Sequence, residues 1–328
     1  MRSEALHIAI IGCGRMGRHH AELIARDGRS RVVAVFDPLA ETAQCLVADT
    51  APTAEIAALW EAVLQRDGID GVILCTPTAE HFMQCQAALE RGWHVLCEKP
   101  LARTAEEIQS LIALGRQHRE RGRAFSVGYQ RRHWGTCRTL RKLVQSGRYG
   151  AVRAVSLHAV ENWQSTIAGT WRDDPVQNPG GFIGDAGSHK LDILGYITGL
   201  PPREVFARSD CRGSRVEIVA SVSAVFGDDV PVTMDFIGDG HRLAEDLHIH
   251  LADADLVLRD NALYVVERNE LRPLSADEPH GEPVTGWLDA ILNGAENLAP
   301  PECAWPVWQL TAAIRESART GMSVRITD

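Results

Sequence analysis

The feature that most constrains the fold of this chain is a glycine pattern near the N-terminus. Gly12, Gly14 and Gly17 lie between the apolar stretch Leu6–Ile11 and a stretch with the pattern of an amphipathic helix. The first glycine of such a pattern permits a tight turn, the second lets a pyrophosphate approach the backbone at the helix N-terminus, and the third lets the helix pack closely on the strand. The pattern therefore predicts a dinucleotide-binding βαβ unit.

An acidic residue follows the second predicted strand. Asp37 comes directly after the stretch Arg31–Phe36, where a carboxylate can accept hydrogen bonds from both hydroxyls of an adenosine ribose. The same carboxylate would repel a 2′-phosphate, and the adjacent residues supply no cation to receive one. The sequence therefore predicts NAD as the cofactor, in preference to NADP.

The first 128 residues alternate short apolar stretches with helical patterns. This alternation is typical of βαβ units that build a parallel sheet, and the near-continuous hydrophobicity of Val72–Cys75 indicates a strand covered on both faces. We predict an α/β chain whose residues 1–128 form a doubly wound Rossmann domain. Its strands are expected at Leu6–Ile11, Arg31–Phe36, Gly71–Thr76, His94–Cys97 and Ala124–Val127, with a further candidate at Ala54–Ala57.

The pattern changes after Tyr129, and 328 residues exceed the size at which one hydrophobic core usually stops growing. Longer strands joined by short turns predict an α+β domain over residues 129–328, with a large, mostly antiparallel open sheet. We expect the last helix, about 306–320, to pack on the first domain. The expected strands are Val152–Asn162, Val205–Arg208, Glu217–Phe226, Val230–Ile237, Asp246–Leu251, Asp255–Arg259 and Ala262–Glu267; the expected helices are Thr136–Ser146, Pro283–Leu292 and Pro306–Arg319.

Composition excludes several classes of protein. A net charge of −9 argues against a nucleic-acid partner, because phosphate contacts need a basic surface. No apolar stretch is long enough to span a membrane, and the N-terminus lacks the pattern of a leader peptide, so a cytoplasmic protein is expected. The eight cysteines form no CxxC pair and are expected to be reduced. His248 and His250 share a strand face without an identifiable third ligand, so no metal site is expected.

Two further motifs follow predicted strands. Residues 75–81 read CTPTAEH, and Glu98-Lys99-Pro100 follows the next strand. Open α/β folds bind ligands at the carboxyl ends of their strands, so a lysine at that edge is well placed for chemistry. The alternative for Glu-Lys-Pro alone is a surface turn, because lysines are mostly exposed.

A third group of polar residues lies in NPGGFIGDAGSHKLDIL, residues 178–194. Asp185 and His189 are four residues apart, a spacing that places both on one face if the segment is helical from Asp185. The alternative is a helix cap, in which Asp185 or Ser188 caps the helix and His189 is a solvated first-turn residue.

Taken together, these segments resemble the glucose-fructose oxidoreductase/inositol dehydrogenase/rhizopine-catabolism (Gfo/Idh/MocA) family. The resemblance spans residues 6 to about 195 and departs at Pro179, which precedes a Gly-Gly pair where many relatives have three glycines. It is carried by GCGRMGRHHAEL, DGVILCTPTAEH, RGWHVLCEKPLA, VGYQRRH and GGFIGDAGSHKLD, in this order and spacing.

The resemblance implies a role for each motif. In such enzymes the lysine of Glu-Lys-Pro and the Asp-xxx-His pair form the catalytic group, which implies Lys99, Asp185 and His189 here. For His81 an ordinary first-turn histidine is the alternative, and for Trp163 and Trp171 a core or interface position. The implied cofactor-binding residues are Gly12, Gly14, Arg15, Met16, Gly17, Asp37, Thr76, Pro77, His81 and Glu98, the last near the nicotinamide ribose; candidate substrate-binding residues are Tyr129, Arg131, Asn162, Trp163, Trp171 and Arg172.

The expected activity is hydride transfer between a secondary alcohol of a sugar, inositol or related polyol and the nicotinamide. An ordinary histidine pKa of about 6.5 suits His189 as general base, while Lys99 would stabilise the developing alkoxide and Asp185 would orient the substrate. Two alternatives stay open: a redox-neutral enzyme, such as an epimerase or eliminase that keeps its NAD, and a non-catalytic sugar or dinucleotide sensor. The uncovered face of an open sheet predicts a homodimer or homotetramer.

Overall fold

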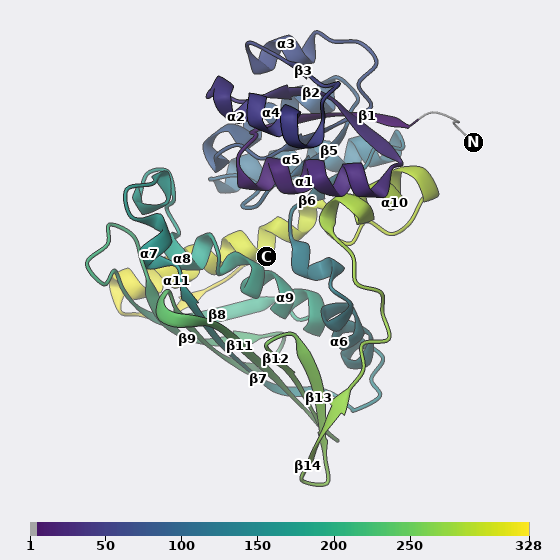
Figure 1. Ribbon diagram of the computed structural model, residues 1–328. Helices are drawn as coiled ribbons and strands as arrows, with labels where there is room; N and C mark the ends of the chain where they lie inside the picture. Colours follow the sequence, from purple (N-terminus) through teal and green to yellow (C-terminus); the bar gives the residue numbers. More distant parts are fainter. Residues whose placement is uncertain (1–4, 328) are drawn as a thin grey trace. The chain divides into compact units, whose positions relative to one another are not determined.

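The computed structural model describes residues 5–327, and the chain divides into two compact units (Figure 1). Unit 1 is the chain up to Tyr129 together with Gly281–Ala304, and unit 2 is Gln130–His280 together with the chain from Trp305 onward. The predicted domains, residues 1–128 and 129–328, differ from this division in residues 281–304, which were expected in the second domain. The expected packing of the last helix on the first domain stays a prediction. Residues 1–4 and 328 of the two predicted domains lie outside the described residues.

Unit 1 is built on a six-stranded parallel sheet with the strand order β3-β2-β1-β4-β5-β6. The order reverses between β1 and β4, which is the topological switch point of a doubly wound fold. The predicted Rossmann domain is confirmed. Its elements are β1 Leu6–Ile11, α1 Arg15–Asp27, β2 Ser30–Phe36, α2 Ala40–Thr50, β3 Glu55–Ile56, α3 Trp60–Leu64, β4 Gly71–Leu74, α4 Thr78–Glu90, β5 His94–Cys97, α5 Ala105–Glu120, β6 Phe125–Val127, α10 Pro283–Asn293 and the 3₁₀ turn η3 Pro301–Cys303.

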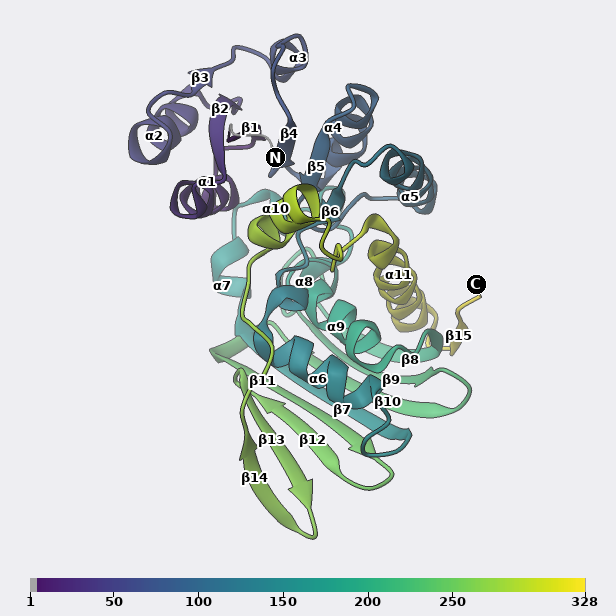
Figure 2. The ribbon, with the colours of Figure 1, turned by 90° about the vertical axis from the view of Figure 1, so that its right-hand side faces the viewer.

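Both faces of this sheet are covered, as its apolar strands require. Ile8 and Ile10 of β1 belong to the core cluster that includes side chains of α1, α2 and α10, whereas α4 and α5 lie on the opposite face (Figure 2). Helix α10 enters this unit because Trp287 packs beneath the strands: a Cβ at Gly71 would lie 2.8 Å from its ring. This long-range packing explains why a local sequence pattern misplaces residues 281–304.

Unit 2 carries a nine-stranded sheet in the order β14-β13-β12-β11-β7-β10-β9-β8-β15. It is mostly antiparallel, as predicted, although β7 and β10 pair in parallel. The elements are η1 Gln130–His133, α6 Gly135–Gln145, β7 Val152–Asn162, α7 Gln164–Ile167, η2 Trp171–Asp173, α8 Gly181–Gly184, α9 Ser188–Thr198, β8 Pro202–Asp210, β9 Val219–Phe226, β10 Val230–Ile237, β11 Asp239–Leu251, β12 Asp255–Arg259, β13 Ala262–Glu267, β14 Glu270–Leu274, α11 Ala304–Thr320 and β15 Val324–Arg325.

Alternation along the strands gives this sheet two different faces. On β7, Val155, Leu157 and Ala159 are buried, whereas His158 between them is exposed. Helices α6, α9 and α11 lie over one side of the sheet in Figure 2. Ser317 of α11 joins that helix to the sheet, since its Oγ accepts a hydrogen bond of 2.9 Å from the backbone N–H of Ala207 in β8. Self-association through the other face remains a proposal.

Two hairpin turns of unit 2 contain residues in the left-handed backbone region. Asp260 and Asn261 have φ values of 46° and 65° and join the antiparallel strands β12 and β13 as a hairpin turn. Arg268 and Asn269, with φ values of 51° and 65°, form the same kind of turn before β14, a strand that the sequence did not predict.

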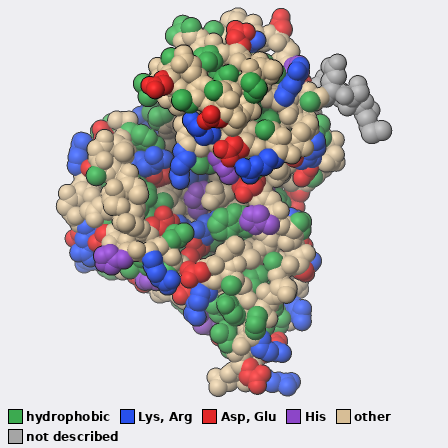
Figure 3. Space-filling view, in the orientation of Figure 1, with side chains coloured by type: hydrophobic (Ala, Val, Ile, Leu, Met, Phe, Trp, Pro, Cys, Tyr) green, Lys and Arg blue, Asp and Glu red, His purple; other side chains and the backbone are tan. Residues whose placement is uncertain are grey.

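Surface charge is mixed in sign. Lys and Arg side chains are interspersed with Asp and Glu on the face shown in Figure 3. Among residues 5–327, no helix is both long and apolar enough to cross a membrane.

Candidate active site

The glycine loop between β1 and α1 has the backbone that a dinucleotide site requires. Gly12 has a φ of 90°, and a Cβ there would lie 2.6 Å from the carbonyl carbon of Cys75. A Cβ at Gly17 would lie 2.0 Å from the Gly12 oxygen, so only glycine lets α1 start this close to β1. Gly14, the N-cap of α1, is exposed, and a Cβ there would meet nothing within 4 Å. The open side of the loop is where a pyrophosphate meets the helix N-terminus.

Asp37 is held by the backbone around it. Its Oδ2 accepts a hydrogen bond of 2.8 Å from the N–H of Cys13, and its Oδ1 accepts one of 2.9 Å from the N–H of Leu39. These bonds fix the carboxylate beside the glycine loop, where the adenosine ribose is expected. Burial, assisted by the Asp37 charge, raises the pKa of the Cys13 thiol to about 12, so this cysteine is an inert packing residue.

Helix α1 also carries two of the softer cofactor candidates. Arg15 and Met16 occupy its first turn, directly after Gly14, with Arg15 exposed and Met16 half-buried. Together with the glycines and Asp37 they lie at the carboxyl ends of β1 and β2, so these residues fit a bound dinucleotide.

The segment after β4 is tied to the segment after β5 by a buried histidine. His81 of α4 is 1% exposed; its ring nitrogens lie 2.9 Å from the Thr76 carbonyl oxygen and 2.8 Å from that of Pro100. Burial lowers the pKa of His81 from its usual value, so at neutral pH the ring has one N–H to donate. The neutral ring of His81 can therefore donate to only one of these two carbonyl oxygens, while its other nitrogen contacts the second. Thr76 Oγ1 donates to Gln84, and the exposed Pro77 is the N-cap of α4.

Glu98 and Lys99 follow β5 at the same edge of the sheet. The Glu98 carboxylate is buried, and its Oε1 lies 2.9 Å from Nε2 of His20 on α1. Although burial alone would raise its pKa, the hydrogen bond and charge of His20 together with Lys99 hold the pKa of Glu98 below its usual value. Lys99 is half-buried and precedes a cis peptide bond to Pro100.

Asp185 and His189 belong to unit 2. The i, i+4 arrangement expected for a helix starting at Asp185 does not form, because α8 ends at Gly184 and α9 begins only at Ser188. Neither expected cap forms: the N-cap of α9 is Gly187, and the Ser188 hydroxyl donates to the Asp185 carbonyl oxygen at 2.7 Å. Asp185 is thus a linker residue between two helices, 5% exposed, while His189 is half-buried in the first turn of α9.

Asp185 has a charged neighbour from an earlier loop. Nε of Arg172 donates to its Oδ2 over 2.8 Å, and the Arg172 guanidinium stacks over Trp171, 4.4 Å from the ring centre. Asn178 secures this loop, since its side-chain amide donates to the Arg172 carbonyl oxygen at 2.8 Å. The structure therefore brings together two substrate candidates and one catalytic candidate within unit 2.

The remaining substrate candidates have different surroundings. Arg131 is buried in an ion pair with Glu245, which engages its guanidinium within unit 2. Trp163 is 7% exposed and packs against Phe182 with ring centres 5.4 Å apart, so it occupies a core position. Tyr129 is 1% exposed, whereas Asn162 is exposed at the end of β7.

Sequence reasoning missed a set of buried charges beside the Asp185 segment. Lys190 is 2% exposed and forms an ion pair with Glu161 at the end of β7. Burial lowers the pKa of Lys190 from its usual value, and the nearby Arg131 charge acts in the same direction. Arg132 makes two-pronged contact with buried Asp192 of α9. No local pattern distinguishes these residues from exposed charges. His20 was missed for the same reason.

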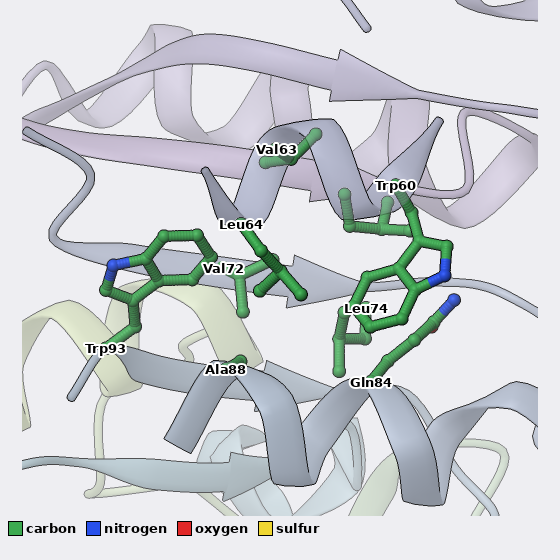
Figure 4. A pocket seen from close by; sticks show the side chains of 9 residues that line it. Trp60, Val63, Leu64, Val72, Leu74, Gln84, Ala88 and Trp93 are labelled. Carbon is green, nitrogen blue, oxygen red and sulfur yellow. The ribbon is translucent and has the colours of Figure 1, made fainter. Parts of the chain in front are cut away.

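Unit 1 contains a small pocket. It lies between α3, α4 and the sheet, and its wall is apolar apart from Gln84 (Figure 4). Trp60 and Gln84 lie near each other at one end and Trp93 lies at the other (Figure 4). This lining is typical of a packing gap rather than a catalytic site. Its residues are Ile11, Trp60, Val63, Leu64, Val72, Leu74, Gln84, Ala88 and Trp93.

Comparison with known families matches both units. Residues 6–129 match the model described as "Oxidoreductase family, NAD-binding Rossmann fold", and residues 137–251 match the "GFO/IDH/MocA C-terminal domain". The chain belongs to the Gfo/Idh/MocA family. Unit 1 of this Gfo/Idh/MocA oxidoreductase is an NAD-binding Rossmann domain, and the resemblance seen in its sequence motifs is confirmed.

Individual relatives agree with this assignment. The chain is 25% identical to D-glucoside 3-dehydrogenase of Escherichia coli, over 99% of each protein. It is 35% identical to inositol 2-dehydrogenase 1 of Mycolicibacterium vanbaalenii, over 58% of this chain and 52% of the relative. The crystal structure of an oxidoreductase domain protein from Kribbella flavida superposes with a TM-score of 0.87 at 25% identity, covering 99% of this chain and 100% of that one.

Proposed function

We propose that this protein is an NAD-dependent dehydrogenase that oxidises a secondary alcohol of a sugar, inositol or related polyol. The observation that carries the proposal is the conjunction of a fitting dinucleotide loop with Lys99 at the carboxyl edge of the same sheet. The presence of Asp185 and His189 in unit 2 supports it, as do the named activities of the relatives. In this proposal unit 1 holds the dinucleotide and unit 2 presents the substrate-binding residues.

The proposed roles follow from what alcohol oxidation requires. The hydroxyl must lose its proton as the carbinol hydrogen leaves as hydride, and NAD supplies the hydride acceptor when bound. His189 takes the hydroxyl proton on its imidazole. The Lys99 ammonium stabilises the developing alkoxide charge, and its effect grows as substrate excludes water. Asp185, held by Arg172, accepts a hydrogen bond from a substrate hydroxyl and orients the ring.

We propose that the protein prefers NAD to NADP because of the Asp37 carboxylate. Its two backbone hydrogen bonds hold the charge beside the glycine loop, where a 2′-phosphate would meet an anion. Assembly into a homodimer or homotetramer is proposed on the face of the unit 2 sheet opposite its helices. Light scattering on the purified protein measures the mass of the assembly. A monomeric mass would contradict the proposed homodimer or homotetramer.

The decisive experiment measures nicotinamide absorbance after mixing the protein and NAD with a panel of inositols, aldoses and sugar acids. We expect reduction with at least one substrate, and a loss of turnover of about 100-fold or more in Lys99→Met, as for removal of an electrostatic stabiliser. The matched control is Lys142→Met, because Lys142 is an exposed lysine of α6. Turnover retained in Lys99→Met would overturn the lysine assignment. If no substrate of the panel reduces NAD although NAD is bound, the result would favour a redox-neutral enzyme or a non-catalytic sensor.

A further inference from the structure

A completely buried histidine of unit 1 has no part in the glycine loop itself. His20 lies on α1 and is 0% exposed, and its Nε2 lies 2.9 Å from Oε1 of Glu98 after β5. The low pKa of the Glu98 carboxyl keeps it ionised, so Nε2 must carry the proton and donate it. The other ring nitrogen, Nδ1, is buried without a hydrogen-bond partner among the described residues. The hydrogen bond to Glu98 is therefore the one hydrogen bond of the His20 ring among the described residues.

The bond joins the two nucleotide-binding halves of the sheet. Helix α1 follows β1 on one side of the switch point, and Glu98 follows β5 on the other, with β4 between them. In a doubly wound sheet of this kind each half receives one nucleotide of a dinucleotide. The adenosine half is marked by Asp37 after β2. Glu98 consequently belongs to the half that receives the nicotinamide nucleotide.

The surroundings of Glu98 fix its carboxylate in one place. A Cβ at Gly128 would lie 2.8 Å from Oε2, so the chain leaves room for the carboxylate by having glycine there. Oε2 lies 3.3 Å from the backbone N–H of Lys99. Burying an ionised carboxylate lowers the free energy of unfolding unless its hydrogen bonds are made. Apolar residues of similar size would fill the same space without this loss of stability. This arrangement is therefore better explained by a ligand than by stability.

We propose that His20 is a positioning residue that holds the Glu98 carboxylate for the ribose of the nicotinamide nucleotide, without touching the cofactor itself. The inference rests on NAD binding by unit 1 and is independent of the proposed substrate. A ribose has two vicinal hydroxyls, and an ionised carboxylate with a fixed orientation accepts hydrogen bonds from both. His20, being fully buried, acts only through Glu98.

The test compares three ligands that share the adenosine half. NADH and ADP-ribose contain the second ribose, whereas ADP lacks it. In titration calorimetry we expect His20→Ala to weaken NADH and ADP-ribose alike by on the order of tenfold, the effect of losing a hydrogen bond to a charged group. The affinity for ADP should stay within about twofold of wild type. Glu98→Gln should show the same selectivity, and His20→Gln, whose amide N–H can donate, should restore part of the loss.

Two further variants separate positioning from a structural role. Gly128→Ala introduces a Cβ that displaces the Glu98 carboxylate from the opposite side, so it should repeat the selective loss while leaving His20 intact. His19→Ala is the matched control, because this neighbouring histidine is part-exposed and faces Glu282 at 3.9 Å instead of Glu98. Thermal melts of each variant report folding.

The outcomes decide the proposal. A parallel fall in the affinities for NADH and ADP would show that His20 merely supports α1, and would overturn the inference. Unchanged NADH affinity in His20→Ala, or in Gly128→Ala if the first variant does not fold, would overturn it as well. None of these titrations requires turnover, so failure of the proposed dehydrogenase activity would leave the result interpretable.

Discussion

Arg172 donates from Nε to Oδ2 of Asp185 over 2.8 Å, so the carboxylate proposed to orient the substrate is half of an ion pair. The arginine is partly exposed, whereas the Asp185 side chain is 7% exposed. A charge-assisted hydrogen bond of this kind favours the ionised carboxylate and restricts its rotation. Arg172 thus holds the Asp185 carboxylate in one orientation.

This pairing predicts that Arg172→Met lowers kcat by roughly tenfold, with a smaller effect on NADH affinity, because the carboxylate loses the donor that orients it. Arg172→Lys should restore little, since a point-charge ammonium cannot reproduce the planar Nε contact or the stack on Trp171. Steady-state kinetics with the identified substrate provide the measurement. Arg215→Met, at an exposed arginine of the same unit, is the control. Equal activity in both variants would refute the role.

Asp37→Ala should weaken NADH binding and improve the relative affinity for NADPH. The change removes the ribose acceptor and the anion that opposes a 2′-phosphate, and it leaves the Cys13 N–H without its acceptor. Competition titrations with the two reduced cofactors measure the ratio. Asp67→Ala removes the same charge from a fully exposed side chain and should leave the ratio unchanged. A constant ratio in Asp37→Ala would contradict the proposed preference.

Stability should fall as pH drops below about 6.5, partly through His81. Burial lowers the pKa of His81 in the folded protein, so the unfolded chain, with a pKa near 6.5, binds more protons in this range. The stabilisation is therefore present above about pH 6.5 and is lost as pH falls toward the folded pKa. Thermal melts of His81→Gln should show a shallower pH dependence than wild type. The exposed His241→Gln has no buried contact to lose and should follow wild type.

Two glycines of the same loop should respond differently to a methyl group. Gly17→Ala places a Cβ 2.0 Å from the Gly12 oxygen, so it should destabilise unit 1 by about 1–3 kcal/mol or more and abolish NADH binding. Gly14→Ala meets nothing within 4 Å, so it should cost less than about 1 kcal/mol, the scale of an N-cap change. Its methyl group would still obstruct the pyrophosphate. Melting curves and NADH titrations compare them, and similar melting temperatures would contradict the steric argument.

The Rossmann unit was predictable because its determinants are local. A strand, a glycine turn, a helix and an acidic residue follow one another within about 30 residues, the scale of a βαβ unit, and each has a recognisable pattern. The position of α10 was not predictable, since Trp287 belongs to unit 1 through contacts with strands far away in the sequence. Strand β15 is only two residues long and exists through pairing with β8.

In the candidate site, too, the residue types were predictable from local motifs, whereas their arrangement was not. Lys99, Asp185 and His189 stand out as motifs, but their local geometry depends on tertiary contacts. Spacing alone suggested a helical face, but α8 ends at Gly184 and α9 begins only at Ser188, so Asp185 lies in the segment that connects the two helices. The pairing of His20 with Glu98 joins residues 78 positions apart, and no periodicity connects them.

The cysteines offer a practical consequence of the burial pattern. Of the eight thiols, only Cys45 on α2 and Cys211 after β8 are exposed, and these two belong to different units. Cys13 and Cys137 are buried, and burial raises the pKa of each thiol to about 12, so both are slow to alkylate. Partial burial and the Glu217 and Asp210 charges also raise the pKa of the exposed Cys211 thiol, so labelling there is favoured by alkaline pH. The wild-type chain therefore carries one natural attachment point for a spin label or fluorophore on each unit. Dipolar spectroscopy on the doubly labelled protein could follow the separation of the two units during a NADH titration without any engineered residue.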